Sequence, residues 1–123
     1  MNLDGLSLPR NDDGIRLKPD EDVIAIIRRS DGALLGRIVL SGSVGGDVEI
    51  DSLCIAEGNR GRGAGAAAIE LLTASAAESG KRRLIAWAPP SNGLAVYFWQ
   101  RSGFHPEFGA RDGGGLVFVL DLA

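Results

Sequence analysis

The stretch that decides the fold begins at residue 48 with an apolar run and ends in a glycine-rich loop. The run reads Val48-Glu49-Ile50-Asp51-Ser52-Leu53-Cys54-Ile55-Ala56, and the loop reads Arg60-Gly61-Arg62-Gly63-Ala64-Gly65-Ala66. The run predicts a strand. Alanine-rich sequence with helical periodicity follows the loop as far as Ser79. This order predicts a strand, a tight loop and a helix that begins at the loop.

The glycine loop has the composition of an anion-binding site. Gly61, Gly63 and Gly65 lack a Cβ atom, so the backbone can adopt left-handed angles and a ligand can approach it closely. The first N–H groups of a helix have no partner within the helix, and the helix dipole places partial positive charge there. Arg60 and Arg62 add positive charge. Such a site favours a phosphate or a pyrophosphate.

Three other interpretations of the loop compete with a pyrophosphate site. A nucleoside-triphosphate loop requires Lys followed by Ser or Thr after its last glycine, but Ala66 follows Gly65 here. A dinucleotide-binding fold requires an acidic residue about 20 residues further on, and residues 84–90 contain none. The third interpretation, a turn that only packs a helix closely on a sheet, stays open on the loop alone.

A second motif downstream favours a ligand site over a packing turn. Asn92 opens a predicted helix that ends in Gly103-Phe104. The pattern Arg60-x-x-Gly63-x-Gly65 resembles the acyl-CoA pyrophosphate loop of the GNAT superfamily of N-acetyltransferases, and a helix that is opened by Asn and ends in Gly-Phe resembles a further motif of that superfamily. Two motifs in this order are more specific than either alone. The resemblance covers residues 46–122.

The rest of the pattern predicts one domain of the α/β (α+β) class. Strands are predicted at residues 23–29, 33–40, 84–88, 104–108 and 116–122, and helices at 66–79 and 92–102. Residues 1–21 are polar and turn-rich, which predicts an irregular segment or a frayed edge strand before a domain at 22–123. The resemblance implies the same architecture, a mixed, mostly antiparallel sheet flanked by helices.

Composition excludes several classes of function. The 123 residues are 45% hydrophobic and 24% charged, with a formal net charge of -3, so neither nucleic acid nor an anionic membrane is an expected partner. No apolar run approaches the roughly 20 residues of a membrane-spanning helix, and no secretory signal is evident, so we expect the cytoplasm. With one cysteine and one histidine, no metal site is expected.

The resemblance implies which residues hold acetyl-CoA, the expected cosubstrate. In the superfamily, the strand before the loop exposes backbone amides to the pantetheine arm, which here implies Leu53, Cys54 and Ile55. The Asn that opens the later helix lies beside the same arm, which implies Asn92. The pyrophosphate is implied to lie on the amides around the loop, formed by Arg60, Gly61, Arg62, Gly63, Ala64, Gly65 and Ala66.

Two strand carboxylates are candidates for the general base that takes a proton from the amine acceptor. Glu49 is the first candidate, because its spacing from Arg60 resembles that of the glutamate base in histone-type members of the superfamily. Asp51 is the second, and it shares a strand face with Glu49 because side chains alternate along a strand. The competing interpretation is that both carboxylates lie on a solvent-facing side of the strand.

The general acid departs from the superfamily pattern. Most members place a tyrosine one helical turn before the Gly of Gly-Phe to protonate the departing thiolate, and that position holds Trp99 here. An indole N–H donates a hydrogen bond but supplies no proton near neutral pH. Tyr97 is predicted to face elsewhere on the helix. Trp87 and Phe98 are predicted to be core residues, like Phe104, and Cys54 is predicted to be a buried structural cysteine.

Two functions from different classes follow. The first is an acyltransferase that moves an acetyl group from acetyl-CoA to a primary amine of a small molecule or a protein. The second is a non-catalytic acyl-CoA-binding or assembly module with a degenerate active site. Superfamily members usually begin with a strand and two helices that shape the acceptor pocket, and few residues precede Val23 here. We therefore expect a homodimer in which a partner completes the acceptor side.

Overall fold

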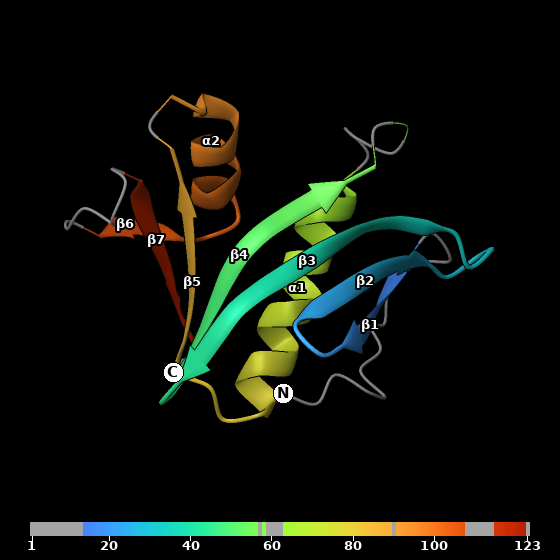
Figure 1. Ribbon diagram of the computed structural model, residues 1–123, viewed down its shortest axis with the longest axis horizontal. Helices are drawn as coiled ribbons and strands as arrows, with labels where there is room; N and C mark the ends of the chain where they lie inside the picture. Colours follow the sequence, from blue (N-terminus) through green and yellow to red (C-terminus); the bar gives the residue numbers. More distant parts are fainter. Residues whose placement is uncertain (1–13, 57, 59–62, 90, 108–114, 123) are drawn as a thin grey trace.

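The computed structural model describes residues 14–56, 58, 63–89, 91–107 and 115–122, with the backbone alone for residues 42–44. A seven-stranded sheet in the order β1-β2-β3-β4-β5-β7-β6 is covered by two helices (Figure 1). This confirms the predicted fold class. The elements are β1 (Ile15–Asp20), β2 (Val23–Arg28), β3 (Leu34–Val44), β4 (Asp47–Ile55), α1 (Ala64–Glu78), β5 (Arg83–Ala88), α2 (Gly93–Arg101), β6 (His105–Glu107) and β7 (Leu116–Asp121).

The N-terminal segment contributes a strand to the sheet. β1 pairs antiparallel with β2 along its whole length, and a turn at Glu21 and Asp22 joins the two. Ile15 and Leu17 are buried in the main core. Residues 1–21 were expected to be irregular or a frayed edge strand, and their last part forms the edge strand β1. A domain boundary at residue 22 would separate β1 from its sheet. Residues 1–13 lie outside the described residues.

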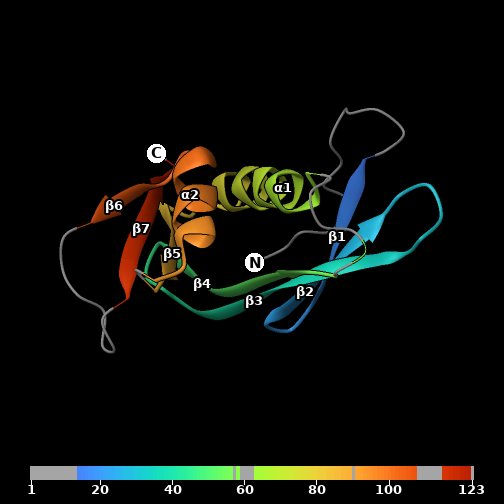
Figure 2. The same cartoon turned by 90° about the horizontal axis from the view of Figure 1, so that it is seen from above.

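Helix α1 begins and ends at glycines. Gly63 is its N-cap with φ 79°, a left-handed conformation that favours a residue without Cβ. Gly80, just beyond the helix, also has φ 79°, which confirms it as the predicted stop. Ile69, Leu72 and Ala76, the predicted apolar face, are all buried. The small buried residues Ala68, Ser75 and Ala76 let α1 pack closely against the β1–β4 part of the sheet, and α2 lies on the same side (Figure 2).

Strands β4 and β5 separate soon after they pair. They run parallel, and their register covers Asp47 with Arg83, Val48 with Leu84 and Glu49 with Ile85. β5 continues in antiparallel register with β7 as far as Ala88. β4 stays on β3 as far as Ile55. The sheet therefore opens between β4 and β5 toward the end where α1 begins (Figure 1).

A β-bulge in β4 changes which side chains face the core. Val39 pairs with Ser52 and Leu40 with Ile50, so Asp51 has no partner in β3. Ile50 is buried before the bulge, whereas Leu53 and Ile55 pack against the core after it. Inward positions therefore change from even to odd numbers at the bulge. This corrects the prediction of a buried cysteine, because Cys54 now points outward and is exposed.

Gly36 lets β3 approach β4 at the open end of the sheet. A Cβ atom built on Gly36 would collide with the backbone carbonyl oxygen of Cys54 and would lie 2.9 Å from the Cα of Ile55. Backbone atoms cannot rotate away as a side chain does. Gly36 is therefore required by close packing of two strands, in the part of β4 that borders the opening.

We expect Gly36→Ala to destabilise the protein, because the two strands must move apart to admit the methyl group. Overpacking of this kind costs about 1–3 kcal/mol, measurable as the free energy of unfolding in urea. Gly93→Ala is the matched control, since its Cβ would meet no atom within 4 Å and should leave stability unchanged or slightly higher. Equal stability of the wild type and Gly36→Ala would contradict the assigned packing.

Candidate functional site

The opening between β4 and β5 exposes one edge of β4. Just beyond β4, the N–H of Ala56 donates to the carbonyl oxygen of Leu35 at 2.8 Å. Because N–H groups alternate in direction along a strand, the N–H of Cys54 points toward β3 as well. The N–H groups of Leu53 and Ile55 point the other way, toward the side that β5 has left. The register thus favours Leu53 over Cys54 as an amide that faces the opening.

The N-terminus of α1 lies at the open end of the sheet. The first hydrogen bond of the helix runs from the N–H of Ala67 to the carbonyl oxygen of Gly63 at 3.0 Å. The N–H groups of Ala64, Gly65 and Ala66 precede it and have no partner within the helix. No acidic side chain occupies the first turn, so the partial positive charge of the helix end is not neutralised there. Arg60, Gly61 and Arg62 lie outside the described residues.

Gly65 brings three elements together beneath this helix end. A Cβ atom on Gly65 would lie 3.3 Å from a ring carbon of Phe98 in α2 and 3.6 Å from a methyl carbon of Leu53 in β4. The glycine therefore lets α1, α2 and β4 approach one another closely. Phe98, predicted to be a core residue, is only half-buried and lies where the two helices meet the opening.

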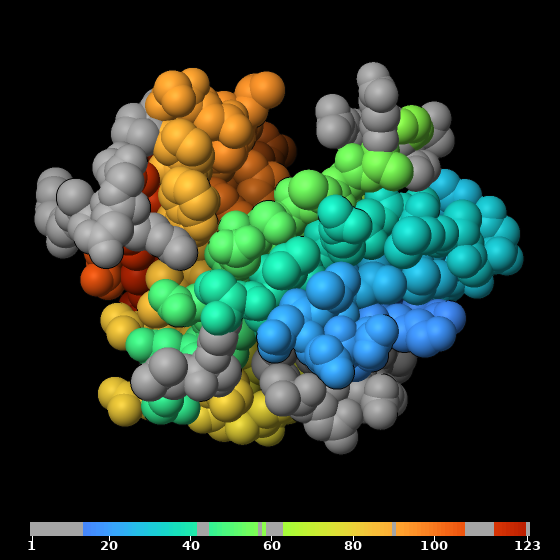
Figure 3. Space-filling view, viewed as in Figure 1, coloured from blue at the N-terminus to red at the C-terminus, as the bar shows by residue number. Residues whose placement is uncertain are grey.

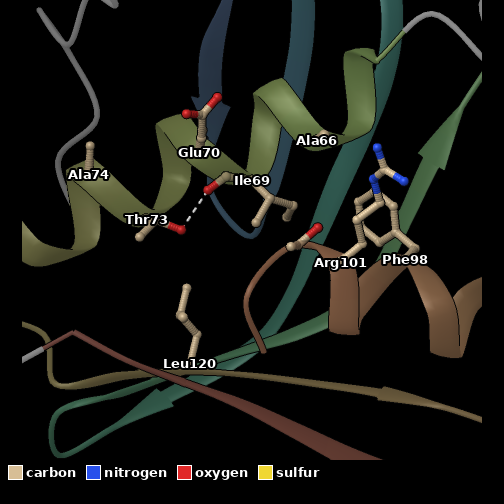
Figure 4. A pocket seen from close by; sticks show the side chains of 9 residues that line it. Ala66, Ile69, Glu70, Thr73, Ala74, Phe98, Arg101 and Leu120 are labelled. Atoms are coloured by element: carbon tan, nitrogen blue, oxygen red, sulfur yellow. Dashed lines mark hydrogen bonds between the residues drawn. The ribbon is translucent and has the colours of Figure 1, made fainter. Parts of the chain in front are cut away.

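A groove of about 580 Å³ runs between α1 and α2. Figure 4 shows Phe98 and Arg101 of α2 facing α1 across it, and the Thr73 hydroxyl donating to the carbonyl oxygen of Ile69 at 2.7 Å. The groove begins at Ala66, the last residue of the glycine loop. Its lining is mainly apolar and consists of Ala66, Ile69, Glu70, Thr73, Ala74, Phe98, Arg101, Ser102 and Leu120.

The two candidates for the general base, Glu49 and Asp51, lie where the opening between β4 and β5 starts. Glu49 is the last residue of β4 that pairs with β5, and it alternates with the buried Val48 and Ile50. Its side chain is therefore on the sheet face away from α1, and it is half-buried. Asp51 is exposed in the bulge, next along the strand. The two carboxylates occupy the opposite side of the sheet from the helix end and the groove.

A bidentate ion pair holds β4 against β5 at the closed end of the opening. The Arg83 guanidinium donates to both carboxylate oxygens of Asp47, from Nε at 3.0 Å and from Nη2 at 2.7 Å. This hydrogen-bonded guanidinium lowers the pKa of Asp47 below its usual value of 3.8, and the Asp47 carboxylate raises the pKa of Arg83. A second carboxylate, that of Glu107, lies 3.8 Å from Arg83. The pair fixes the point from which the two strands diverge.

The predicted residues of α2 take different positions. Asn92 is the N-cap, and its side-chain oxygen accepts a hydrogen bond from the N–H of Ala95 at 3.1 Å. Tyr97 is 58% exposed, and its hydroxyl accepts a hydrogen bond from Arg101, in agreement with the prediction that it faces elsewhere. Trp99 is 5% exposed, and its ring lies 5.0 Å from those of both Phe98 and Phe104. Trp99 is therefore part of the core.

Sequence reasoning missed three features of this region. The Asp47–Arg83 pair joins residues far apart in the chain, and no local pattern predicts it. The close approaches at Gly36 and Gly65 depend on neighbouring elements in space. Sequence predicted Phe98 only as a core residue. Its contact with Gly65 depends on the packing of two helices.

Comparisons with known proteins agree with this geometry. The family model described as the acetyltransferase (GNAT) family matches residues 5–104. Solved structures with a similar fold include a GNAT-family acetyltransferase from Bacillus anthracis, with TM-score 0.71, 18% identity and coverage of 82% of this chain and 66% of that one. A search of curated proteins found no relative by sequence.

Two further structures have the same fold. The PaiA N-acetyltransferase from Thermoplasma acidophilum, in complex with coenzyme A, has TM-score 0.69 and 16% identity, with coverage of 80% of this chain and 59% of that one. The ribosomal-protein-S18-alanine N-acetyltransferase from Escherichia coli has TM-score 0.69 and 15% identity, with coverage of 85% and 72%. Identities this low show the fold alone.

The Asp47–Arg83 pair predicts a pH-dependent stability. Because the pKa of Asp47 is lowered on folding, its contribution is present above the unfolded pKa near 3.8 and is lost as the pH falls through the lower folded value. Asp47→Asn should therefore be less stable than the wild type at pH 7, and the difference should shrink below pH 3.8. Urea unfolding at pH 7 and pH 3 measures this.

Glu78→Gln is the control, since it removes an exposed carboxylate at the far end of α1 and should change stability little at either pH. A difference between Asp47→Asn and the wild type that stays constant from pH 7 to pH 3 would show that the ion pair is not its cause.

Proposed function

Because the chain belongs to the acetyltransferase (GNAT) family, whose members bind acyl-CoA, we propose that it transfers an acetyl group from acetyl-CoA to a primary amine of a small molecule or a protein. The observation that carries the proposal is the separation of β4 from β5 after Glu49 and Ile85, beside the unneutralised N-terminus of α1. This geometry offers backbone amides to a thioester and partial positive charge to a pyrophosphate in one place.

The residues of the helix side fit acetyl-CoA. The N–H groups of Ala64, Gly65 and Ala66 bind the pyrophosphate in this proposal, together with the loop residues Arg60, Gly61, Arg62 and Gly63. The exposed edge of β4 at Leu53 and Ile55 runs beside the pantetheine arm in this proposal. Cys54 and Asn92 border the same path. The groove that begins at Ala66 supplies apolar surface for the rest of the cosubstrate.

The acceptor approaches from the opposite side of the sheet, where Glu49 lies. A carboxylate there attracts a protonated amine and removes one proton, which leaves a neutral nitrogen that can attack. The nitrogen attacks the thioester carbonyl carbon and the C–N bond forms. The nitrogen then gives up a second proton to water, and the C–S bond breaks to release a thiolate. The Leu53 N–H points toward the carbonyl oxygen in this arrangement and stabilises the negative charge that develops there. Asp51 is the alternative base.

The departing thiolate takes its proton from water in this proposal. Trp99 occupies the helix position where most members of the superfamily have a tyrosine, and it is packed between Phe98 and Phe104 in the core. A thiol has a pKa of about 8.5, so its thiolate is a tolerable leaving group without a dedicated acid. The same observation favours the second candidate function, an acyl-CoA-binding module that lacks catalysis.

We also propose that the protein acts as a homodimer. β1 leads into β2 through a turn at Glu21 and Asp22, where superfamily members usually have two helices that shape the acceptor pocket. Among the described residues, no helix covers the sheet face on which Glu49 lies (Figure 2). A second copy would supply the missing wall. No helix within the described part of the chain is long and apolar enough to cross a membrane.

Binding of CoA should raise the thermal stability of the protein. Ligand at 100 times its dissociation constant adds about 2.7 kcal/mol, which a thermal-shift measurement detects. Gly63→Glu should abolish the shift by placing a carboxylate at the helix N-terminus. Gly63→Ala is the matched control, because it carries the same backbone strain at φ 79° without the charge, and it should keep most of the shift. An absence of any shift in the wild type at millimolar CoA would refute the proposed function.

Glu49→Gln should lower the rate of amine acetylation by about 10²-fold or more at neutral pH and leave the CoA shift intact. The measurement is release of CoA thiol from acetyl-CoA with a panel of primary amines and Lys-bearing peptides. Asp51→Asn is the comparison variant and should be affected less. Wild-type rates in Glu49→Gln would transfer the role to Asp51 or to water, and a wild type that binds CoA but releases no thiol with any amine would favour the binding module.

A further inference from the structure

One face of the β1–β4 part of the sheet has no helix over it among the described residues. Ile15, Leu17, Ile24, Ile26 and Ile38 point toward α1 and are buried. The residues that alternate with them point the other way, onto the face seen in Figure 3. We call this surface the open face and define it by Arg16, Lys18, Asp20, Val23, Ala25, Arg37 and Val39, with the turn residues Glu21 and Asp22 at its border.

Strand register arranges the open face in rows across the strands. One row places Lys18 beside Ala25 and Ala25 beside Arg37. The neighbouring row places Asp20 beside Val23 and Val23 beside Val39. Two residues along a strand separate the rows, or about 7 Å. The sequence of β1 thus changes from basic to acidic within the width of the face.

The two ends of the open face carry opposite charge. Arg16, Lys18 and Arg37 are exposed at one end, and Asp20, Glu21 and Asp22 are exposed at the other. Between them Val23 is 42% exposed, and Ala25 and Val39 are partly exposed. Within the described part of the chain these six charged side chains form no ion pairs with one another. The face therefore presents an apolar centre between a basic and an acidic border.

A surface with this charge order is complementary to itself. A twofold axis that lies in the interface and crosses the strands between the two rows would place each basic end on the acidic end of the other copy. The same rotation would place the exposed Val23 of one copy against the apolar centre of the other. Such an isologous contact uses one patch twice, as most homodimers do.

We propose that the open face is the homodimer interface of this protein, with the basic end of each copy on the acidic end of the other. The inference rests on the homodimer proposed above and assigns its surface. Glu49 lies on the same side of the sheet, beyond the acidic end along β4, so the second copy would also form a wall of the acceptor approach. The helix side, proposed for CoA, stays uncovered.

The size of the face determines the strength of the contact. Three strands about 4.8 Å apart and roughly six residues long span about 14 by 20 Å. This area is smaller than the roughly 800 Å² per partner of a standard interface, so the dimer should be weak and reversible. Its charged borders should make it sensitive to salt, because the Debye length falls from about 10 Å at 0.1 M to about 3 Å at 1 M.

Sedimentation and light scattering over a concentration series at 0.05 M and 1 M salt give the first test. We expect the mass to rise from monomer to dimer with concentration, and the dissociation constant to rise at least tenfold at high salt. A monomer at every concentration would overturn both the homodimer and its assigned surface. A dimer that salt does not affect would overturn the charged contact.

Charge exchange between the two ends gives the sharper test. Lys18→Glu with Arg37→Glu makes both ends acidic, and Asp20→Lys with Asp22→Lys makes both ends basic. Each variant alone should be monomeric, because like charges then face each other, whereas an equimolar mixture of the two should form a heterodimer. Recovery in the mixture also shows that both variants are folded. Monomers that stay monomeric when mixed, or variants that dimerise alone, would contradict the assigned surface.

Two controls separate this inference from the proposed function. Glu78→Lys makes a charge change on α1, away from the open face, and should leave the dissociation constant within twofold of the wild type. The thermal shift with CoA should persist in both charge-exchange variants, since it reports the helix side. A wild type that dimerises but shows no thermal shift with CoA would refute the CoA site alone. A charge-exchange variant that dimerises by itself and keeps a normal CoA shift would refute the assigned surface alone.

Discussion

The separation of β4 from β5 is the constraint on which the rest of this structure depends. The two strands pair over three positions, and the bidentate Asp47–Arg83 contact holds them together at the closed end. Beyond that point each strand has a firm partner on its other side, β3 for β4 and β7 for β5. The opening therefore exposes backbone polar groups without loosening either half of the sheet. Exposed amides held by a rigid neighbour are what a thioester carbonyl requires.

Glycines have two roles at this site: one adopts a left-handed conformation, and two others let neighbouring elements approach closely. Gly63 supplies a left-handed cap that begins α1 at the opening. Gly36 and Gly65 have no such angle, and they matter because a Cβ atom would meet the carbonyl of Cys54 in one case and the ring of Phe98 in the other. These three glycines bring two strands and two helices within contact of one small region. The partial charge of the helix end and the exposed edge of β4 consequently lie beside each other.

The two sides of the sheet carry different groups. The N-terminus of α1 and the groove of α1 and α2 are on one side, and Glu49 and the open face are on the other. In the proposed reaction each substrate would enter from its own side, and the two would meet at the opening. Trp99 is packed in the core between Phe98 and Phe104, so in the proposed reaction it supplies no proton to the thiolate.

The sequence by itself determined the order and kind of the elements. Periodicity predicted β2 to β7 and both helices, Gly80 predicted the end of α1, and the paired motifs predicted the family, because each of these signals is local in the chain. It also predicted that Tyr97 and Trp99 face different directions, since the helical period sets this.

The tertiary structure alone decided which groups meet. The bulge at Asp51 arises from the register of β4 on β3, and it turned Cys54 outward where the usual burial of cysteine predicted a buried side chain. The edge position of β1, the Asp47–Arg83 pair and the contact of Phe98 with Gly65 likewise depend on elements that are distant in sequence. Local sequence fixes the direction of a side chain relative to its own backbone, whereas its partners are fixed by how the strands and helices pack.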